Sequence, residues 1–291
     1  MKTKIAVLGS TGMAGSMIAH YFKQQGFNVA EYSRTWIPGC TTIPFDAHNQ
    51  DCLESLNLDI TRGHIDLIIN CIGYLVQPSQ DNPSEAVYLN SYFPHLLEKM
   101  TENTKVKVIH LSTDCIFSGE QLGGYNEEAL PNETNWYGRS KALGELNNDK
   151  DLTLRQSIIG PAPQASNSGF FNWILTELSP EVTGWTTALW NGITTLELAK
   201  QIHSILVNSP QLSGVVNLVP PDIVSKWALI KMIVEEWDLP LKVNERIQEY
   251  SYKLLRTARG DAPILKSDYN KQLKELHIYM EKYNIEVGKL K

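Results

Sequence analysis

The chain has 291 residues, of which 42% are hydrophobic and 20% charged, and its formal net charge is -6 at pH 7. This composition is typical of a soluble globular protein that is long enough for one large α/β domain and a smaller lobe, and it excludes disordered and collagen-like classes. The acidic balance and the lack of a Lys/Arg run argue against nucleic acid as a partner, because binding to phosphates needs a basic face.

The first residues read MKTKIAVLG, so only four apolar residues precede Gly9. This run is too short for a signal peptide or a membrane span, and we expect a buried first strand of a cytoplasmic protein without a membrane partner. The cysteines Cys40, Cys52, Cys71 and Cys115 have neither C-x-x-C spacing nor a histidine at ligand spacing. They are therefore expected to be free thiols, and we predict no metal site.

Short apolar runs alternate with helical periodicity along the first half of the chain. Strands are predicted at 4–9, 26–33, 65–73 and 106–113, and helices at 13–25, 51–57 and 84–100. The alternation is typical of an α/β protein with a Rossmann-type, doubly wound parallel sheet. Its strands are apolar on both faces, which fits burial between two layers of helices.

The second half of the chain predicts a return to the sheet and then a smaller C-terminal, substrate-binding lobe. Further strands are predicted at 152–160 and 214–219, and helices at 170–178, 194–207, 225–237 and 267–283, with N-caps at Thr194, at Ser225 and at Ser267 or Asp268. We expect residues 1–160 to form the NADP-binding domain, with 186–219 returning to it. Residues 161–185 and 220–291 would form the lobe.

Glycines at three-residue spacing separate the first predicted strand from the first predicted helix. Such a turn brings backbone N–H groups and a helix N-terminus close to a pyrophosphate. The residues of this turn that we expect to contact the cofactor are Gly9, Thr11, Gly12, Met13 and Gly15.

The end of the second predicted strand bears on the choice between NADP and NAD. An acidic residue there would bind the ribose hydroxyls of NAD, whereas an arginine would pair with the 2′-phosphate of NADP. Ser33 occupies the position of the carboxylate and Arg34 follows it, although a shift of one residue in the alignment would bring Glu31 into question. NADP is therefore favoured and NAD is less expected. Asp46 and Ala47 are predicted to lie beside the adenine.

The stretch NWYGRSK, residues 135–141, contains Tyr137 and, four residues later, Lys141. This spacing alone proves little, because about one accidental Tyr-x-x-x-Lys is expected in a chain of this composition. On a helix the two side chains would share a face, and the ammonium would lower the pKa of the phenol by about two units at a distance of about 5 Å.

Three stretches together resemble the extended short-chain dehydrogenase/reductases, most closely the dTDP-4-dehydrorhamnose reductase group. They are GSTGMAG at 9–15, HLSTDCIFSG at 110–119 and WYGRSK at 136–141. The resemblance implies that Tyr137 donates a proton, that Lys141 orients the cofactor ribose and that Thr113 polarises the substrate carbonyl. Ser112 is the alternative for that last role.

The resemblance also places further residues in the two binding sites. The cofactor contacts that it implies are Cys71, Gly73 and Asn90, together with Tyr137 and Lys141 themselves. For the substrate, Ser112 and Asp114 lie beside Thr113, and Arg155, Asn172, Trp185, Trp190 and Asn191 are candidates because nucleobases stack on aromatic rings and diphosphates pair with arginine.

Within the family, the sequence favours a reductase that uses NADPH and acts on a 4-keto, 6-deoxy sugar nucleotide in polysaccharide biosynthesis. Related dehydratases have Asp-Glu after the threonine, whereas this chain has Asp114 and Cys115. An epimerase and a non-catalytic, dinucleotide-binding regulatory subunit remain alternatives. A homodimer that pairs the apolar face of the predicted helix 84–100 is also possible.

Overall fold

The computed structural model describes residues 3–35, 41–120, 124–163, 169–247, 250 and 252–287. Cys40 lies outside these residues, and the other cysteines are free thiols. Within the described part of the chain, no group of His, Cys, Asp and Glu side chains is arranged to hold a metal ion. In the same part, no helix has the length and apolar character needed to cross a membrane.

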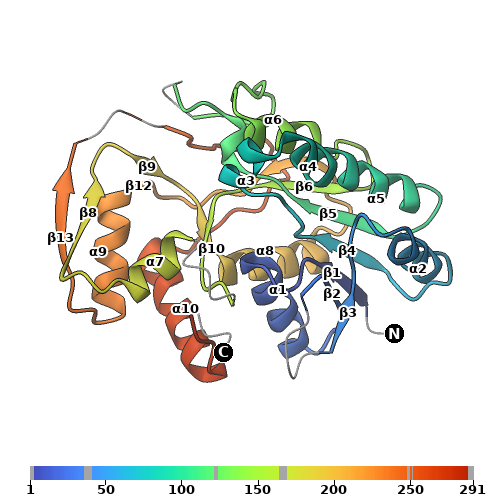
Figure 1. Cartoon of the computed structure of the whole chain (residues 1–291), viewed down its shortest axis with the longest axis horizontal. Helices are drawn as coiled ribbons and strands as arrows, with labels where there is room; N and C mark the ends of the chain where they lie inside the picture. Colours follow the sequence, from blue (N-terminus) through green and yellow to red (C-terminus); the bar gives the residue numbers. More distant parts are fainter. Residues whose placement is uncertain are drawn as a thin grey trace.

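A seven-stranded parallel sheet forms the centre of the molecule, and it confirms the predicted Rossmann-type α/β fold (Figure 1). Its strands are β1 (Lys4–Leu8), β2 (Asn28–Ser33), β3 (Thr42–Pro44), β4 (Leu67–Asn70), β5 (Lys107–Leu111), β6 (Leu152–Arg155) and β11 (Gly214–Asn217). Their order is β11-β6-β5-β4-β1-β2-β3. The strand order reverses between β1 and β4, so the carboxyl ends of these strands form the crevice in which such folds bind ligands.

Helices cover both faces of the sheet (Figure 1). On one face, α1 (Met13–Gln24) packs against α8 (Thr195–Asn208), with a core that includes Ile18 and Ile202. On the other face, the core includes Leu56 of α2 (Gln50–Thr61) and Leu97 of α5 (Phe93–Thr101). The remaining helical segments before β6 are α3 (Val76–Asp81), α4 (Pro83–Ala86), the π-helix η1 (Val87–Tyr92), the 3-10 turn η2 (Asp114–Ile116) and α6 (Trp136–Leu143).

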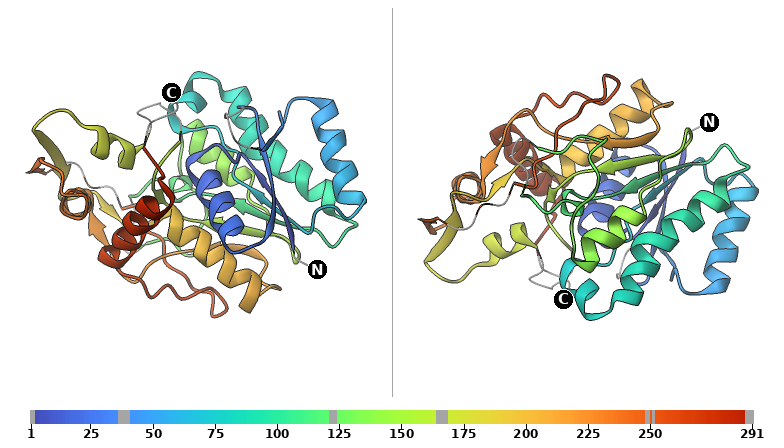
Figure 2. Two further views of the ribbon diagram at one scale, coloured as in Figure 1. Left: turned by 90° about the horizontal axis from the view of Figure 1, so that it is seen from below. Right: turned by 90° about the horizontal axis from the view of Figure 1, so that it is seen from above.

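A smaller lobe, built from residues in the C-terminal half, stands beside the sheet in both views of Figure 2. Its elements are α7 (Phe170–Thr176), β8 (Glu181–Trp185), β9 (Leu189–Trp190), β12 (Val224–Ser225), α9 (Lys226–Glu236), β13 (Lys242–Arg246) and α10 (Tyr269–Tyr283). β8 pairs with β13 and β9 with β12, around a separate hydrophobic cluster. The assignment of residues 1–160 and 186–219 to one functional domain stays a prediction.

The structure confirms the predicted helix starts, because the side chains of Thr194, Ser225 and Asp268 each accept a backbone N–H at the N-cap. Two predicted elements differ. The helix predicted at 84–100 is interrupted by the π-helix η1, and the strand predicted at 152–160 is divided between β6 and the short β7 (Ile158–Ile159). β7 leaves the main sheet and pairs with β10 (Ile193–Thr194), which precedes α8.

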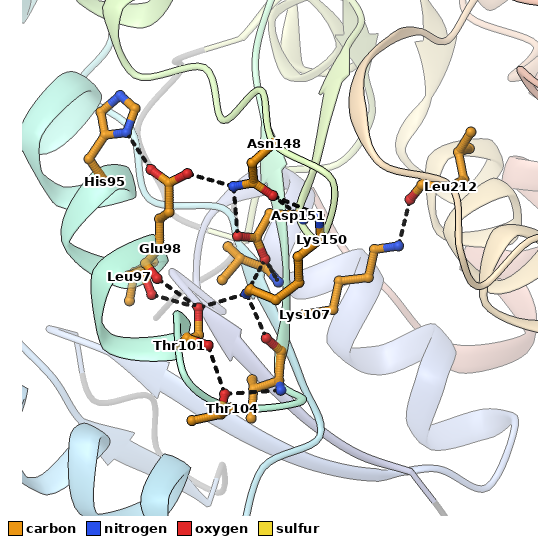
Figure 3. Close-up of polar contacts among 12 residues, drawn as sticks. His95, Leu97, Glu98, Thr101, Thr104, Lys107, Asn148, Lys150, Asp151 and Leu212 are labelled. Carbon is orange, nitrogen blue, oxygen red and sulfur yellow. Dashed lines mark hydrogen bonds and ion pairs between the residues drawn. The ribbon is translucent and has the colours of Figure 1, made fainter.

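A buried polar network fixes the amino ends of β5 and β6 (Figure 3). The carboxylate of Asp151 is fully buried and accepts hydrogen bonds from Val108 N at 2.8 Å and from Lys150 Nζ at 2.6 Å. Lys150 Nζ also donates to Thr101 Oγ1 at the end of α5, at 3.0 Å. The network joins two central strands to α5 at the sheet edge opposite the crevice, and thereby fixes the strand that carries the site described next.

Candidate active site

The turn after β1 brings backbone N–H groups to the crevice, and its glycines are needed for steric reasons. Gly9 has a φ of +79°, and a Cβ on Gly15 would lie 2.2 Å from the Gly9 carbonyl oxygen. Helix α1 follows with Gly12 as its N-cap, and no side chain caps it. Its first N–H groups are therefore open to an anionic ligand.

A hollow of about 290 Å³ lies over this turn and the carboxyl ends of β2, β3 and β4. The residues expected to contact a dinucleotide that line it are Gly9, Thr11, Gly12, Ser33, Arg34, Asp46, Ala47, Cys71 and Gly73. The sequence analysis missed further lining residues, namely Thr35, Phe45, Ile72, Tyr74, Leu75 and Leu89. Phe45 follows β3 and Leu89 lies in the π-helix η1, so only the tertiary structure brings them to the same hollow.

Hydroxyl groups and an arginine gather at the end of β2. Thr11 Oγ1 lies 2.6 Å from Ser33 Oγ, which also accepts the Thr35 N–H at 3.1 Å. Arg34 is exposed, whereas the Glu31 carboxylate pairs with Lys23 of α1. Glu31, the alternative residue for binding the ribose hydroxyls of NAD, is therefore already paired with a lysine.

The predicted catalytic residues lie on the loop that follows β5 and on α6. Asn135 caps α6 by accepting the Gly138 N–H at 2.9 Å. A Cβ on Gly138 would lie 2.4 Å from the Cys115 carbonyl oxygen, so glycine lets the first turn of α6 pack directly on the segment after Thr113. Thr113 and Tyr137, 24 residues apart in the sequence, come within hydrogen-bonding reach of each other.

The environment of Tyr137 keeps its phenol protonated. Burial raises its pKa above the ordinary value, and the nearby Cys115 and Asp114 act in the same direction, whereas hydrogen bonding with Thr113 opposes them. The expected lowering of the Tyr137 pKa by Lys141 is therefore wrong for this structure. The physical reason is that the cost of moving a phenolate out of water outweighs the stabilising contacts.

Lys141 is buried and its ammonium contacts β5. Its Nζ donates to the Leu111 carbonyl oxygen at 2.6 Å and lies 3.3 Å from His110 Nε2. Burial lowers the pKa of Lys141 to about 8, and the opposing effects of Glu145 and Cys71 are smaller. A lysine with this pKa changes its charge close to neutral pH.

His110, which the sequence analysis did not assign to the site, links Lys141 to β4. Its Nδ1 lies 3.1 Å from Asn70 Nδ2, and the Oδ1 of the same amide accepts the Ile72 N–H at 3.1 Å. Asn70 and His110 are paired in the register of β4 and β5. A polar side chain in the otherwise apolar run VIHL, residues 108–111, was the signal that could have revealed it.

The π-helix η1 holds α6 in place, and its Asn90 does so directly. Asn90 Nδ2 donates to Ser140 Oγ of α6 and to the Tyr74 carbonyl oxygen, both at 3.0 Å, and its Oδ1 accepts the Tyr74 N–H. Ser91 Oγ donates to the Ser140 carbonyl oxygen at 2.7 Å. Asn90 thus connects the loop that lines the hollow with α6, while its predicted contact with a cofactor stays a prediction.

Several residues predicted to contact the substrate are engaged within the protein. Glu145 accepts hydrogen bonds from Ser112 Oγ and from Arg155 Nε and Nη2, at 2.7 to 2.8 Å. Asn172 holds the backbone of Ala162 through both ends of its amide. A direct contact of these side chains with a substrate stays a prediction.

Other residues predicted to contact the substrate lie on the loop after β5 and in the lobe. Asp114, next to Thr113, is mostly buried and accepts a hydrogen bond from the Thr113 hydroxyl at 3.1 Å. Trp185, on β8 of the lobe, is 37% exposed. Two residues that the sequence analysis missed, Lys226 of α9 in the lobe and Lys253, which pairs with Glu133 ahead of α6, interact electrostatically with Asp114. The site therefore lies between the sheet edge and the lobe.

Comparisons with known proteins agree with this arrangement. The family model described as RmlD substrate binding domain matches residues 3–159. The probable low-salt glycan biosynthesis reductase Agl14 of Haloferax volcanii is 30% identical over 183 residues, which cover 60% of this chain and 60% of that protein. The match thus spans less than two thirds of that relative's length.

Two solved structures share the fold over nearly the whole chain. The dTDP-4-dehydrorhamnose reductase from Bacillus anthracis, in complex with NADP, has a TM-score of 0.79 at 17% identity and covers 96% of this chain and 100% of its own. MoeE5, in complex with UDP-glucose and NAD, has a TM-score of 0.75 at 17% identity, with 97% of this chain and 100% of its own covered. These likenesses establish the fold.

Proposed function

Because this chain belongs to the RmlD substrate-binding domain family, we propose that it reduces the 4-keto group of a 6-deoxy sugar nucleotide with NADPH. The observation that carries the proposal is the gathering of Thr113, Tyr137 and Lys141 at the carboxyl end of β5, beside the glycine turn of β1. The names of two of the relatives, a glycan biosynthesis reductase and a dTDP-4-dehydrorhamnose reductase, support a reductase.

The residues around the hollow fit a dinucleotide. Gly9 and Gly15 keep the turn close to the strand ends, and the uncapped start of α1 offers N–H groups to a pyrophosphate. NADPH, when bound, would supply the hydride. Exposed Arg34 would pair with the 2′-phosphate of NADPH, and the engagement of Glu31 by Lys23 favours NADPH over NADH.

Tyr137 would deliver the proton that the reduced substrate needs. Its raised pKa keeps the phenol protonated at neutral pH, and an alkoxide is much more basic than a phenolate, so the proton transfer is favourable. Thr113 would donate its hydroxyl hydrogen to the substrate oxygen, exchanging its present bond with Asp114. Lys141, held by the Leu111 carbonyl oxygen, would position the cofactor ribose.

The test is consumption of NADPH, followed by its absorbance, with a panel of 4-keto-6-deoxy sugar nucleotides. We expect turnover with at least one of them and its loss in Tyr137→Phe. An epimerase would convert a sugar nucleotide without net consumption of NADPH, and a regulatory subunit would bind the cofactor without turnover. Either result, or full activity of the Tyr137→Phe variant, would overturn the proposal.

We also propose that the chain forms a homodimer through the face shared by η1 and α6. Val87 and Tyr92 of η1 and Trp136 and Leu143 of α6 are exposed by 39 to 67%. These four side chains lie on two helices that pack against each other, and a contiguous exposed apolar surface is typical of a protein–protein contact. Light scattering of the purified protein would give twice the mass of the chain, and the mass of a single chain would refute the dimer.

A further inference from the structure

A lysine of the lobe is enclosed by two aromatic rings near the candidate active site. Lys226 is the first residue of α9, directly after the N-cap Ser225. Its Nζ lies 4.8 Å from the ring centre of Phe170 of α7 and 5.0 Å from the ring centre of Trp190 of β9. Cation–π contacts with rings on two different elements fix the position of the ammonium.

No acceptor within the described ranges forms a hydrogen bond or an ion pair with Lys226 Nζ. The other partly buried lysines are satisfied: Lys107 Nζ donates to two carbonyl oxygens, Lys150 Nζ pairs with Asp151 and Lys253 Nζ pairs with Glu133. An ammonium has three donors, and leaving them unmatched away from water costs free energy. Lys226 therefore differs from these lysines, because its ammonium has no acceptor among the described residues.

The neighbouring Trp190 adds a second unmatched donor. Its indole is 4% exposed, and in the described structure its Nε1 has no hydrogen-bond partner. Buried indole N–H groups normally find an acceptor. A partly buried cation and a buried N–H group, in contact with each other and both without an acceptor in the described structure, indicate a ligand with oxygen acceptors and negative charge.

The position of Lys226 relates this cluster of Lys226, Phe170 and Trp190 to the reacting end of the site. Burial lowers the pKa of Lys226, and the groups that oppose this are Asp114 and, to a smaller extent, Cys115, the two residues after Thr113. The ammonium therefore faces the loop that carries Thr113, but from the side of the lobe. A substrate held by Thr113 and Tyr137 at one end would extend toward Lys226 at the other.

We propose that Lys226, in the clamp of Phe170 and Trp190, binds the diphosphate of the nucleotide-sugar substrate. This inference rests on the proposed function, which supplies a substrate with this group. In a pyranose, C1, which carries the diphosphate, lies across the ring from C4. When the 4-keto group lies at Thr113 and Tyr137, the diphosphate therefore points away from the sheet edge. The oxygens of the diphosphate provide acceptors for the Lys226 ammonium.

The test measures binding of dTDP and UDP by calorimetry to the wild type and to Lys226→Met, which keeps an apolar stem between the rings. We expect the wild type to bind one of the two nucleotides and Lys226→Met to bind it at least about tenfold more weakly. Lys226→Arg should retain most of the affinity. The matched control is Lys231→Met on the same helix, where Nζ lies 4.9 Å from the Trp227 ring centre; its affinity should be unchanged.

Equal affinity of the wild type and Lys226→Met, or no binding of either nucleotide to the wild type, would overturn the inference. If Lys226→Met does not fold, Lys226→Gln takes its place. Nucleotide binding needs no turnover, so the two proposals fail separately. Weakened binding without reduction of any keto sugar refutes only the reductase, whereas reduction with unchanged dTDP and UDP affinity in the variant refutes only the subsite.

Discussion

His110 Nε2 and Lys141 Nζ lie 3.3 Å apart beneath the candidate active site. The amide of Asn70 is oriented by the Ile72 N–H, so that its Nδ2 donates to His110 Nδ1. Burial lowers the pKa of His110 well below its usual range, and the ring is neutral, with its single hydrogen on Nε2. The imidazole thus presents an N–H to Lys141 Nζ. Because an ammonium has only donors, this N–H favours the neutral amine of Lys141 over its charged form.

We therefore predict that His110→Phe raises the pKa of Lys141 and moves the alkaline limb of the kcat/KM profile to higher pH. The N–H that opposes the ammonium is lost in this variant. His110→Gln, whose amide can again present an N–H, should return the limb toward the wild-type position. The measurement is kcat/KM for the reduction against pH. A uniform loss of activity, with both limbs unmoved, would show that His110 has only a structural role.

The buried Lys141 should make stability depend on pH. Its pKa is about 8 in the folded protein and 10.5 as a model value, so between these values the unfolded chain binds more protons. The contribution of Lys141 to the free energy of unfolding should therefore increase as the pH rises from about 8 to 10.5. The full difference corresponds to roughly 3 kcal/mol.

Lys141→Met removes this titration, and we expect the variant to be inactive yet more stable than the wild type at pH 7. Urea unfolding of both proteins at several pH values below 9 measures the difference in the free energy of unfolding. The pH stays below 9 because burial raises the pKa values of Cys71 and Cys115 to about 12, and these thiols add their own pH dependence above pH 9. A variant less stable than the wild type at pH 7 would contradict the expectation.

Gly15→Ala should damage both the fold and cofactor binding. The added Cβ would lie 2.2 Å from the Gly9 carbonyl oxygen and 2.9 Å from its carbon, so that the turn must move away from α1. We expect a loss of roughly 1–3 kcal/mol in the free energy of unfolding. The NADPH affinity, measured by calorimetry, should fall as well. Gly260→Ala is the control, because nothing lies within 4 Å of its added Cβ.

Arg34→Ala should reduce the preference for NADPH over NADH. If Arg34 pairs with the 2′-phosphate, the ratio of kcat/KM for the two cofactors should fall by about ten- to a hundredfold, mainly through KM for NADPH. Arg62→Ala, which removes another exposed arginine at the end of α2, should leave the ratio unchanged. An unaltered ratio in Arg34→Ala would mean that other residues select the cofactor.

The sequence by itself determined the fold class, and it predicted where the candidate active site lies. The alternation of apolar strands and amphipathic helices specifies a parallel sheet, and Gly9, Gly12 and Gly15 mark its first crossover, because these signals are local in the chain. Thr113, Tyr137 and Lys141 were recognisable for the same reason: each lies in a short motif at a strand end or a helix start.

The tertiary structure decided the state of those residues and their partners. The raised pKa of Tyr137 and the lowered pKa of Lys141 follow from burial, which depends on segments far away in the sequence. His110 becomes part of the site only because β4 and β5 pair in register. Lys226 is enclosed only because α7, β9 and α9 fold together into the lobe. Periodicity and spacing describe neighbours along the chain, whereas charge and acidity are set by neighbours in space.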